Sequence, residues 1–108
     1  MGRIVISCYR PKPGQQDGLR ELVLGHVAAL RSLGFVSDRA PVIMQAKDGT
    51  WVEVFEWASR EAIEAAHRDP AVGRMWEAFG KVSEFVPISQ VPEGSKLFSE
   101  FTPAEEKA

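Results

Sequence analysis

Apolar residues recur along the chain at two different spacings. Residues 3–9 and two later stretches, 41–47 and 50–57, are rich in β-branched and aromatic types, as is typical of β-strands. Between the first two of these stretches, residues 16–33 carry apolar side chains at helical spacing, which predicts a helix with one buried stripe. The stripe consists of Leu19, Leu22, Val23, Val27, Leu30 and Leu33. Gly34 is expected to end this helix.

Turn and capping residues divide the second half of the chain. Asp48-Gly49 joins the two later strands, and this pair tolerates the positive φ angles of a tight type I′ hairpin. Ser59 is expected to cap the next helix, and Asp69-Pro70 marks a second start, so this helix is predicted in two pieces. A last strand is expected over residues 83–89, where Pro87 cannot donate a ladder hydrogen bond and therefore indicates a sheet edge.

The resulting order, β-α-β-β-α-β, predicts an α+β fold of the ferredoxin-like kind. Such a sandwich has a four-stranded antiparallel sheet with two helices on one face. A chain of 108 residues is too short for two domains, so residues 1–101 are assigned to a single domain. Residues 102–108 have too little apolar content to pack and are predicted to form a flexible C-terminal tail.

The strand over 50–57 is apolar on both faces. Trp51, Phe55 and Trp57 alternate with Val52 and Val54, although a lone sheet with helices on one side should have one polar, solvated face. The second face therefore needs a cover. We expect a homodimer that forms face to face through the sheets, the alternative being a C-terminal segment that folds over its own sheet.

Charge and cysteine content exclude several classes of partner. The formal net charge is −2 with no run of Lys or Arg, which predicts binding to neither nucleic acid nor an anionic membrane. The apolar start breaks at Ser7, so it is neither a signal peptide nor a spanning helix, and we expect a cytoplasmic protein. The single cysteine, Cys8, cannot form an intramolecular disulfide and is interpreted as a small buried residue.

The pattern around Trp57 resembles a known family. An apolar strand closes on Trp57, then come "ASREAIEAAH", Pro70, and a helix with Trp76 and Phe79. Over about residues 3–88 this resembles the antibiotic biosynthesis monooxygenase-like group of the dimeric α+β barrel superfamily. The resemblance implies a dimeric barrel with the helices outside, and either cofactor-free oxygenation of aromatic polyketides or no assigned activity. The haem-degrading branch has an asparagine on the first strand, which this chain lacks.

Two histidines occupy apolar helix faces. His26 lies within the stripe of the first helix, and His67 lies beside Ile63 on the second, so both should point at the same sheet face. A carboxylate from strand 50–57 could orient one of them. Glu53 and Glu56 have opposite parity, and Glu53 is favoured because it shares the parity of Trp57, which the resemblance turns toward the cavity.

These residues support two hypotheses of different classes. In the first, His67 or His26, oriented by Glu53, is a general base, and Tyr9, Trp57, Trp76 and Glu56 are candidates for binding a flat organic substrate. The reaction would be cofactor-free oxygenation or isomerisation of a small aromatic or enolisable metabolite. In the second, a non-catalytic homodimeric module binds a small ligand or supports an assembly, and the histidines are packed core residues. No metal site is predicted, because no ligand spacing enforces one.

Overall fold

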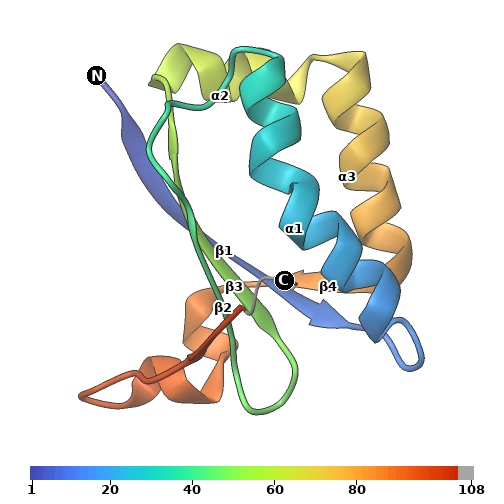
Figure 1. Ribbon diagram of the computed structural model, residues 1–108, viewed down its shortest axis with the longest axis vertical. Helices are drawn as coiled ribbons and strands as arrows, with labels where there is room; N and C mark the ends of the chain where they lie inside the picture. Colours follow the sequence, from blue (N-terminus) through green and yellow to red (C-terminus); the bar gives the residue numbers. More distant parts are fainter. Residues whose placement is uncertain (105–108) are drawn as a thin grey trace.

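The structure, a computed structural model, describes residues 1–104. It contains three α-helices and a five-stranded antiparallel sheet (Figure 1). The elements in chain order are β1 (Arg3–Pro11), α1 (Gln16–Ser32), β2 (Val42–Gln45), β3 (Trp51–Trp57), α2 (Arg60–His67), α3 (Pro70–Val82), β4 (Ser83–Val86), the short 3₁₀ helices η1 (Ile88–Gln90) and η2 (Pro92–Ser95), and β5 (Thr102–Pro103). The mixed α+β class predicted from the sequence is confirmed.

The sheet has one strand more than predicted. Its strand order is β4-β1-β3-β2-β5, and every neighbouring pair is antiparallel. The additional strand, β5, pairs with β2 through Thr102 opposite Gln45. The predicted tail, residues 102–108, therefore begins with a strand. Two residues without an apolar pattern did not signal this strand. Residues 105–108 of the predicted tail lie outside the described part of the chain.

Capping residues begin and end the helices where the sequence predicted. Gly34 takes a φ of 84° just after α1, a conformation that residues with a Cβ rarely adopt. The side chain of Ser59 accepts a hydrogen bond from the backbone N–H of Ala62 and begins α2. Asp69 accepts from two backbone N–H groups in the first turn of α3, with Pro70 as the first helical residue. The predicted break at Asp69-Pro70 is thus confirmed.

The β2–β3 hairpin is present, but its turn is not the predicted type I′. That turn needs positive φ at both central residues, whereas Gly49 at 93° is the only residue of the loop with positive φ. The Gly49 N–H donates to the carbonyl of Ala46, and the Ala46 N–H donates to the carbonyl of Thr50. Asp48 instead accepts from the Thr50 N–H through its side chain. This Asx contact favours a longer loop with only one left-handed residue.

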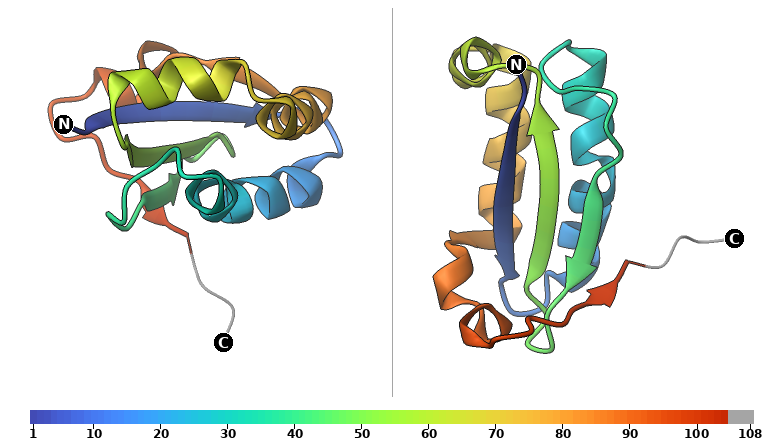
Figure 2. Two further views of the ribbon diagram at one scale, coloured as in Figure 1. Left: turned by 90° about the horizontal axis from the view of Figure 1, so that it is seen from above. Right: turned by 90° about the vertical axis from the view of Figure 1, so that its left-hand side faces the viewer.

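The helices lie on one face of the sheet (Figure 2), and the core fills the space between them. Alternate residues of β3 point toward the helices. Phe55 and Trp57 pack with Val72 in one buried cluster, and Trp51 packs with Leu19 and Phe79 in another. This parity places Glu53 on the helix-facing side.

The opposite sheet face, called the outer face here, is half covered. Val91 and Phe101 of the C-terminal segment pack against Cys8 and Val52 at one end. Glu93 of the same segment accepts a hydrogen bond from the Lys47 backbone N–H at 2.9 Å. The other end of the outer face exposes three apolar side chains, each more than half accessible: Ile4, Ile6 and Val42. Within residues 1–104, no helix has the length and apolar character needed to cross a membrane.

Candidate functional site

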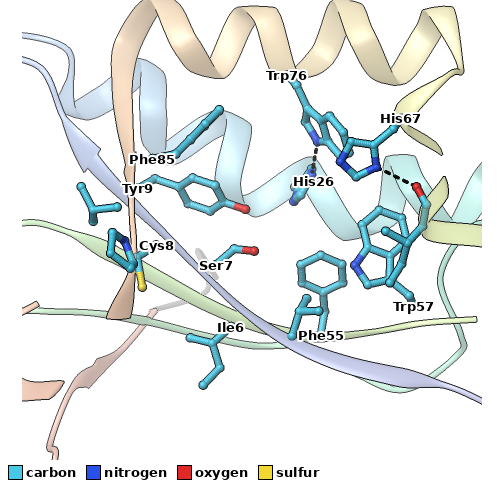
Figure 3. A pocket seen from close by; sticks show the side chains of 14 residues that line it. Ile6, Ser7, Cys8, Tyr9, His26, Phe55, Trp57, His67, Trp76 and Phe85 are labelled. Carbon is cyan, nitrogen blue, oxygen red and sulfur yellow. Dashed lines mark hydrogen bonds between the residues drawn. The ribbon is translucent and has the colours of Figure 1, made fainter. Parts of the chain in front are cut away.

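A cavity of about 560 Å³ opens between β1, the three helices and β4 (Figure 3). It lies where β4 pairs only with the stretch Cys8–Pro11 of β1, so that within residues 1–104 no strand lies beside Arg3–Ser7 on that edge. The volume is in the range of small-molecule sites. The lining is mostly apolar and aromatic: Val5, Ile6, Ser7, Cys8, Tyr9, His26, Phe55, Trp57, Ile63, His67, Trp76, Phe85, Val86 and Pro87.

A fully buried carboxylate lies behind the cavity wall. Glu53 has no accessible surface, and its Oε1 accepts a hydrogen bond from the Tyr9 hydroxyl at 2.9 Å. Strand pairing explains the contact, because Ser7 lies opposite Glu53 and Tyr9 is two residues further along the same face of β1. Oε2 of Glu53 has no hydrogen-bond partner among the described residues. Within residues 1–104, the hydrogen bonds of this carboxylate therefore fall on Oε1.

His26 is the second partner of this carboxylate. It lies in the buried stripe of α1, only 3% exposed, with Nδ1 2.8 Å from Oε1 of Glu53. On the cavity side, the indole N–H of Trp76 donates to Nε2 of His26 at 3.0 Å. An indole N–H can only donate, so Nε2 carries no proton, and the ring proton resides on Nδ1. His26 is therefore a neutral imidazole that donates to Glu53.

The three groups form a continuous hydrogen-bonded chain from α3 to the sheet. It runs from Trp76 through His26 to Glu53, which also accepts from Tyr9. The carboxylate fixes the imidazole tautomer and would stabilise the positive charge if Nε2 took a proton. In its chemistry the arrangement is a general base with an orienting carboxylate, set in an aromatic cavity.

His67 reaches the same cavity but makes different contacts. Its side chain is exposed at the rim, and Nδ1 lies 2.7 Å from the carbonyl oxygen of Ile63, one turn earlier in α2. A carbonyl only accepts, so Nδ1 is the protonated nitrogen. The His67 ring also packs edge-to-face on Trp76, with centroids 5.0 Å apart. Both predicted histidines thus lie at one cavity, but only His26 is hydrogen-bonded to a carboxylate.

The structure separates the two candidate glutamates. Glu56 has the opposite parity to Glu53 and does not line the cavity; its Oε1 accepts from the Ser37 hydroxyl at 2.7 Å and from Nε of Arg39 at 3.2 Å. These hydrogen bonds lower the pKa of Glu56. Glu56, predicted among the substrate-binding residues, therefore lies outside this cavity, because the two-residue period of the strand turns it away.

The predicted aromatic wall is present, with additions. Tyr9, Trp57 and Trp76 line the cavity as expected, and so do Phe85 and the hydroxyl-bearing Ser7, which sequence reasoning missed. Ser7 could have been found from parity, because it lies between Val5 and Tyr9 on the same face of β1. Figure 3 shows its hydroxyl directed toward the cavity.

Comparison with protein-family models finds no match to this chain, and a search of curated proteins finds none. Function must therefore be argued from the cavity itself. Within residues 1–104, no group of three or more His, Cys, Asp or Glu side chains could hold a metal ion.

Ionisation of Tyr9 can be measured directly and reports on its burial beside Glu53. Burial, with the adjacent Glu53 carboxylate as a further cause, raises the pKa of Tyr9 far above its ordinary value of 10.0. Tyr9 is the only tyrosine in the chain, so the ultraviolet absorbance of tyrosinate reports on it alone. We expect no tyrosinate in the folded protein at pH 10–11, and half-ionisation near pH 10 after denaturation in urea.

The same shift makes stability depend on pH. Above about pH 10 the unfolded chain releases the tyrosine proton while the folded chain keeps it, so the free energy of unfolding falls as pH rises. Below that pH the stabilisation is complete. The Tyr9→Phe variant should show a flatter pH dependence above pH 10. Ionisation of the folded protein at the ordinary pKa would show that Tyr9 is not buried beside Glu53.

Proposed function

We propose that this protein is a cofactor-independent enzyme that removes a proton from a small aromatic or enolisable metabolite, for oxygenation by O₂ or for isomerisation. The observation that carries the proposal is the neutral His26, held by the buried Glu53 carboxylate at 2.8 Å and lining an aromatic cavity. A histidine held in this way by a carboxylate has the geometry of a general base.

Each cavity residue then has a defined part. Nε2 of His26 takes the proton, and Glu53 stabilises the imidazolium that forms. Trp57, Trp76 and Phe85 hold the flat ring of the substrate and exclude water. His67 at the rim is the weaker candidate for the base, because its Nδ1–H is directed to a backbone carbonyl rather than to a carboxylate.

The oxygenation balances without a further reductant. The deprotonated phenol or enol supplies four electrons to one O₂ molecule. One oxygen atom enters the substrate as a new carbonyl, the other leaves as water, and the phenol becomes a quinone. In isomerisation the proton returns from His26 to another atom of the same substrate, with no net redox change.

The fold supports placing the chain in the antibiotic biosynthesis monooxygenase-like group. The β-α-β-β-α-β order, with a helix broken at Pro70, and the strand order β4-β1-β3-β2 agree with a ferredoxin-like unit to which β5 is added. The half-covered outer face supports association of two copies through their sheets, since Ile4, Ile6 and Val42 are each more than half exposed there.

The dimer can be tested on the exposed end of the outer face. We expect wild type to sediment at about 24 kDa, twice the chain mass of 12.0 kDa, and Ile4→Asp to sediment as a monomer. Leu24→Asp is the matched control, because Leu24 is an exposed apolar residue of α1 on the helix side. A monomeric wild type, or a dimer unaffected by Ile4→Asp, would contradict the dimer.

The enzymatic proposal is tested by oxygen uptake. Purified protein, stripped of metal with a chelator, is offered naphthols, naphthohydroquinones and anthrones, and O₂ consumption and product spectra are recorded. We expect catalytic O₂ consumption with at least one of these, and quinone as the product. For the isomerisation branch, exchange of substrate hydrogen with deuterated water is followed by NMR. If neither O₂ uptake nor hydrogen exchange exceeds the uncatalysed rate, the proposal that the protein is an enzyme is rejected.

One observation favours the alternative, a non-catalytic module that binds a small ligand or supports an assembly. Both ring nitrogens of His26 already have hydrogen-bond partners within the protein, as expected of a packed core histidine. Under this alternative, substitution of His26 changes stability or ligand affinity and no turnover exists to lose.

A further inference from the structure

The hydrogen bond between Trp76 and His26 restricts what the cavity can bind. Nε2 is the ring nitrogen of His26 on the cavity side, and its lone pair is occupied by the indole N–H at 3.0 Å. The other nitrogen, Nδ1, is committed to Glu53 at 2.8 Å, and Glu53 has no accessible surface. Any ligand that bonds to His26 must therefore do so at Nε2, and only after Trp76 has given up its contact.

The Glu53 carboxylate fixes the tautomer of His26, with the proton on Nδ1. Moving the proton to Nε2 would leave Nδ1 and the carboxylate oxygen facing each other with lone pairs at hydrogen-bond distance, which is unfavourable in a buried site. The neutral ring therefore offers the cavity an acceptor and no donor. The hydroxyl of Tyr9, which also lines the cavity, is already directed to Glu53.

We propose that the site selects ligands that donate a hydrogen bond to Nε2 of His26, and that the Trp76 indole is the cap that such ligands displace. This inference rests on the proposed function and names its substrate class: planar molecules with a phenol or enol O–H. A ketone, quinone or ether directs a lone pair at the lone pair of Nε2, so it cannot replace the indole.

Trp76 is placed so that it can move. Its side chain is only partly buried, and its ring packs edge-to-face against His67 at the exposed rim and against Trp57 within the cavity. The His26 contact is the one hydrogen bond that the described structure gives its indole N–H. A ligand O–H that replaces this donor leaves the number of hydrogen bonds at His26 unchanged, and the ligand ring can pack on the displaced indole.

Selection of donors also assists turnover. Oxidation of a phenol to a quinone removes the O–H that competed with the indole. The Trp76 N–H then recovers its place on Nε2 and favours release of the product. The cap therefore distinguishes the substrate from its own oxidation product, although the two have nearly the same shape.

The test compares two probes that differ in one hydrogen-bond donor, 1-naphthol and 1-methoxynaphthalene. Calorimetry on the full chain should show naphthol bound about tenfold more tightly than the ether. In nitrogen–proton NMR spectra, naphthol should shift the indole N–H resonance of Trp76, and the ether should leave it in place. Trp76→Phe keeps the aromatic ring but removes the cap, so its affinity for naphthol should rise by about threefold to tenfold with no gain for the ether.

Trp51→Phe is the matched control, because Trp51 does not line the cavity and this substitution should leave both affinities unchanged. Equal affinity of wild type for the two probes, absence of naphthol binding, or equal weakening of both by Trp76→Phe would overturn the inference. If Trp76→Phe fails to fold, the affinities of wild type for the two probes and the shift of its Trp76 indole resonance still test the inference. Preference for naphthol without O₂ uptake or hydrogen exchange would reject the proposed function alone, and turnover without this preference would reject the cap alone.

Discussion

Replacement of His26 by glutamine is expected to lower turnover on an accepted substrate by about a hundredfold to ten-thousandfold, the usual contribution of a general base. The glutamine amide is meant to preserve the surrounding hydrogen bonds, since its N–H₂ can donate to Glu53 and its oxygen can accept from Trp76. It cannot take a proton near neutral pH. The rate of O₂ uptake per chain measures the loss, and thermal unfolding followed by circular dichroism shows whether the fold is kept.

His67→Gln is the control for His26→Gln. His67 is exposed at the rim, and its Nδ1 bonds to a carbonyl of its own helix, so the same substitution should change turnover little. If His67→Gln abolishes turnover and His26→Gln does not, the base is assigned to the wrong histidine. If His26→Gln lowers stability by about 1–3 kcal/mol and turnover is unaffected, His26 is a structural residue.

Replacement of Glu53 by alanine is expected to have the largest effect on stability, a loss of about 3–5 kcal/mol in the free energy of unfolding. The change leaves the Tyr9 hydroxyl and the His26 Nδ1–H without their acceptor inside the core, and it opens a space between the sheet and α1. A domain of this size has about 5–15 kcal/mol in total, so the variant will be only marginally folded. Urea denaturation measures the difference.

Glu53→Gln separates the negative charge of the carboxylate from its hydrogen bonding. Its amide oxygen can still accept from Tyr9 and His26, so we expect a much smaller loss than with alanine. The negative charge that supports an imidazolium is absent, and turnover should therefore fall even where stability is largely kept. Equal stability of wild type, Glu53→Gln and Glu53→Ala would show that the buried hydrogen bonds contribute nothing measurable to folding.

The strand and helix periods predicted which residues share a face. The stripe of the first helix turned His26 inward, and parity along residues 50–57 placed Glu53 on the same face as Trp57; both follow from repeats of 3.6 and two residues that operate locally. The choice of Glu53 over Glu56 also needed the family resemblance, which turns Trp57 toward the cavity. The contact between Trp76 and His26 joins side chains fifty positions apart and depends on how two helices pack, so no local period could reveal it.

Two further differences have local causes that the sequence pattern hid. The Asp48-Gly49 turn is not type I′ because Asp48 uses its side chain to accept from Thr50 and keeps negative φ. The segment before Thr102–Pro103 packs across the outer face, and this places the two residues beside the edge of β2, where they pair as a short strand. An apolar pattern is absent there, since an edge strand of two residues buries almost nothing.

The positions of two prolines limit the addition of further strands at the outer strands of the sheet. The outermost strands of the sheet are β4 and β5, with four and two residues. Pro87 follows β4 directly, and Pro103 ends β5, so each outer strand finishes at a residue that has no N–H to offer a further strand. Strands from other copies therefore find poor templates at both outer strands, and fibril growth by strand addition there is disfavoured.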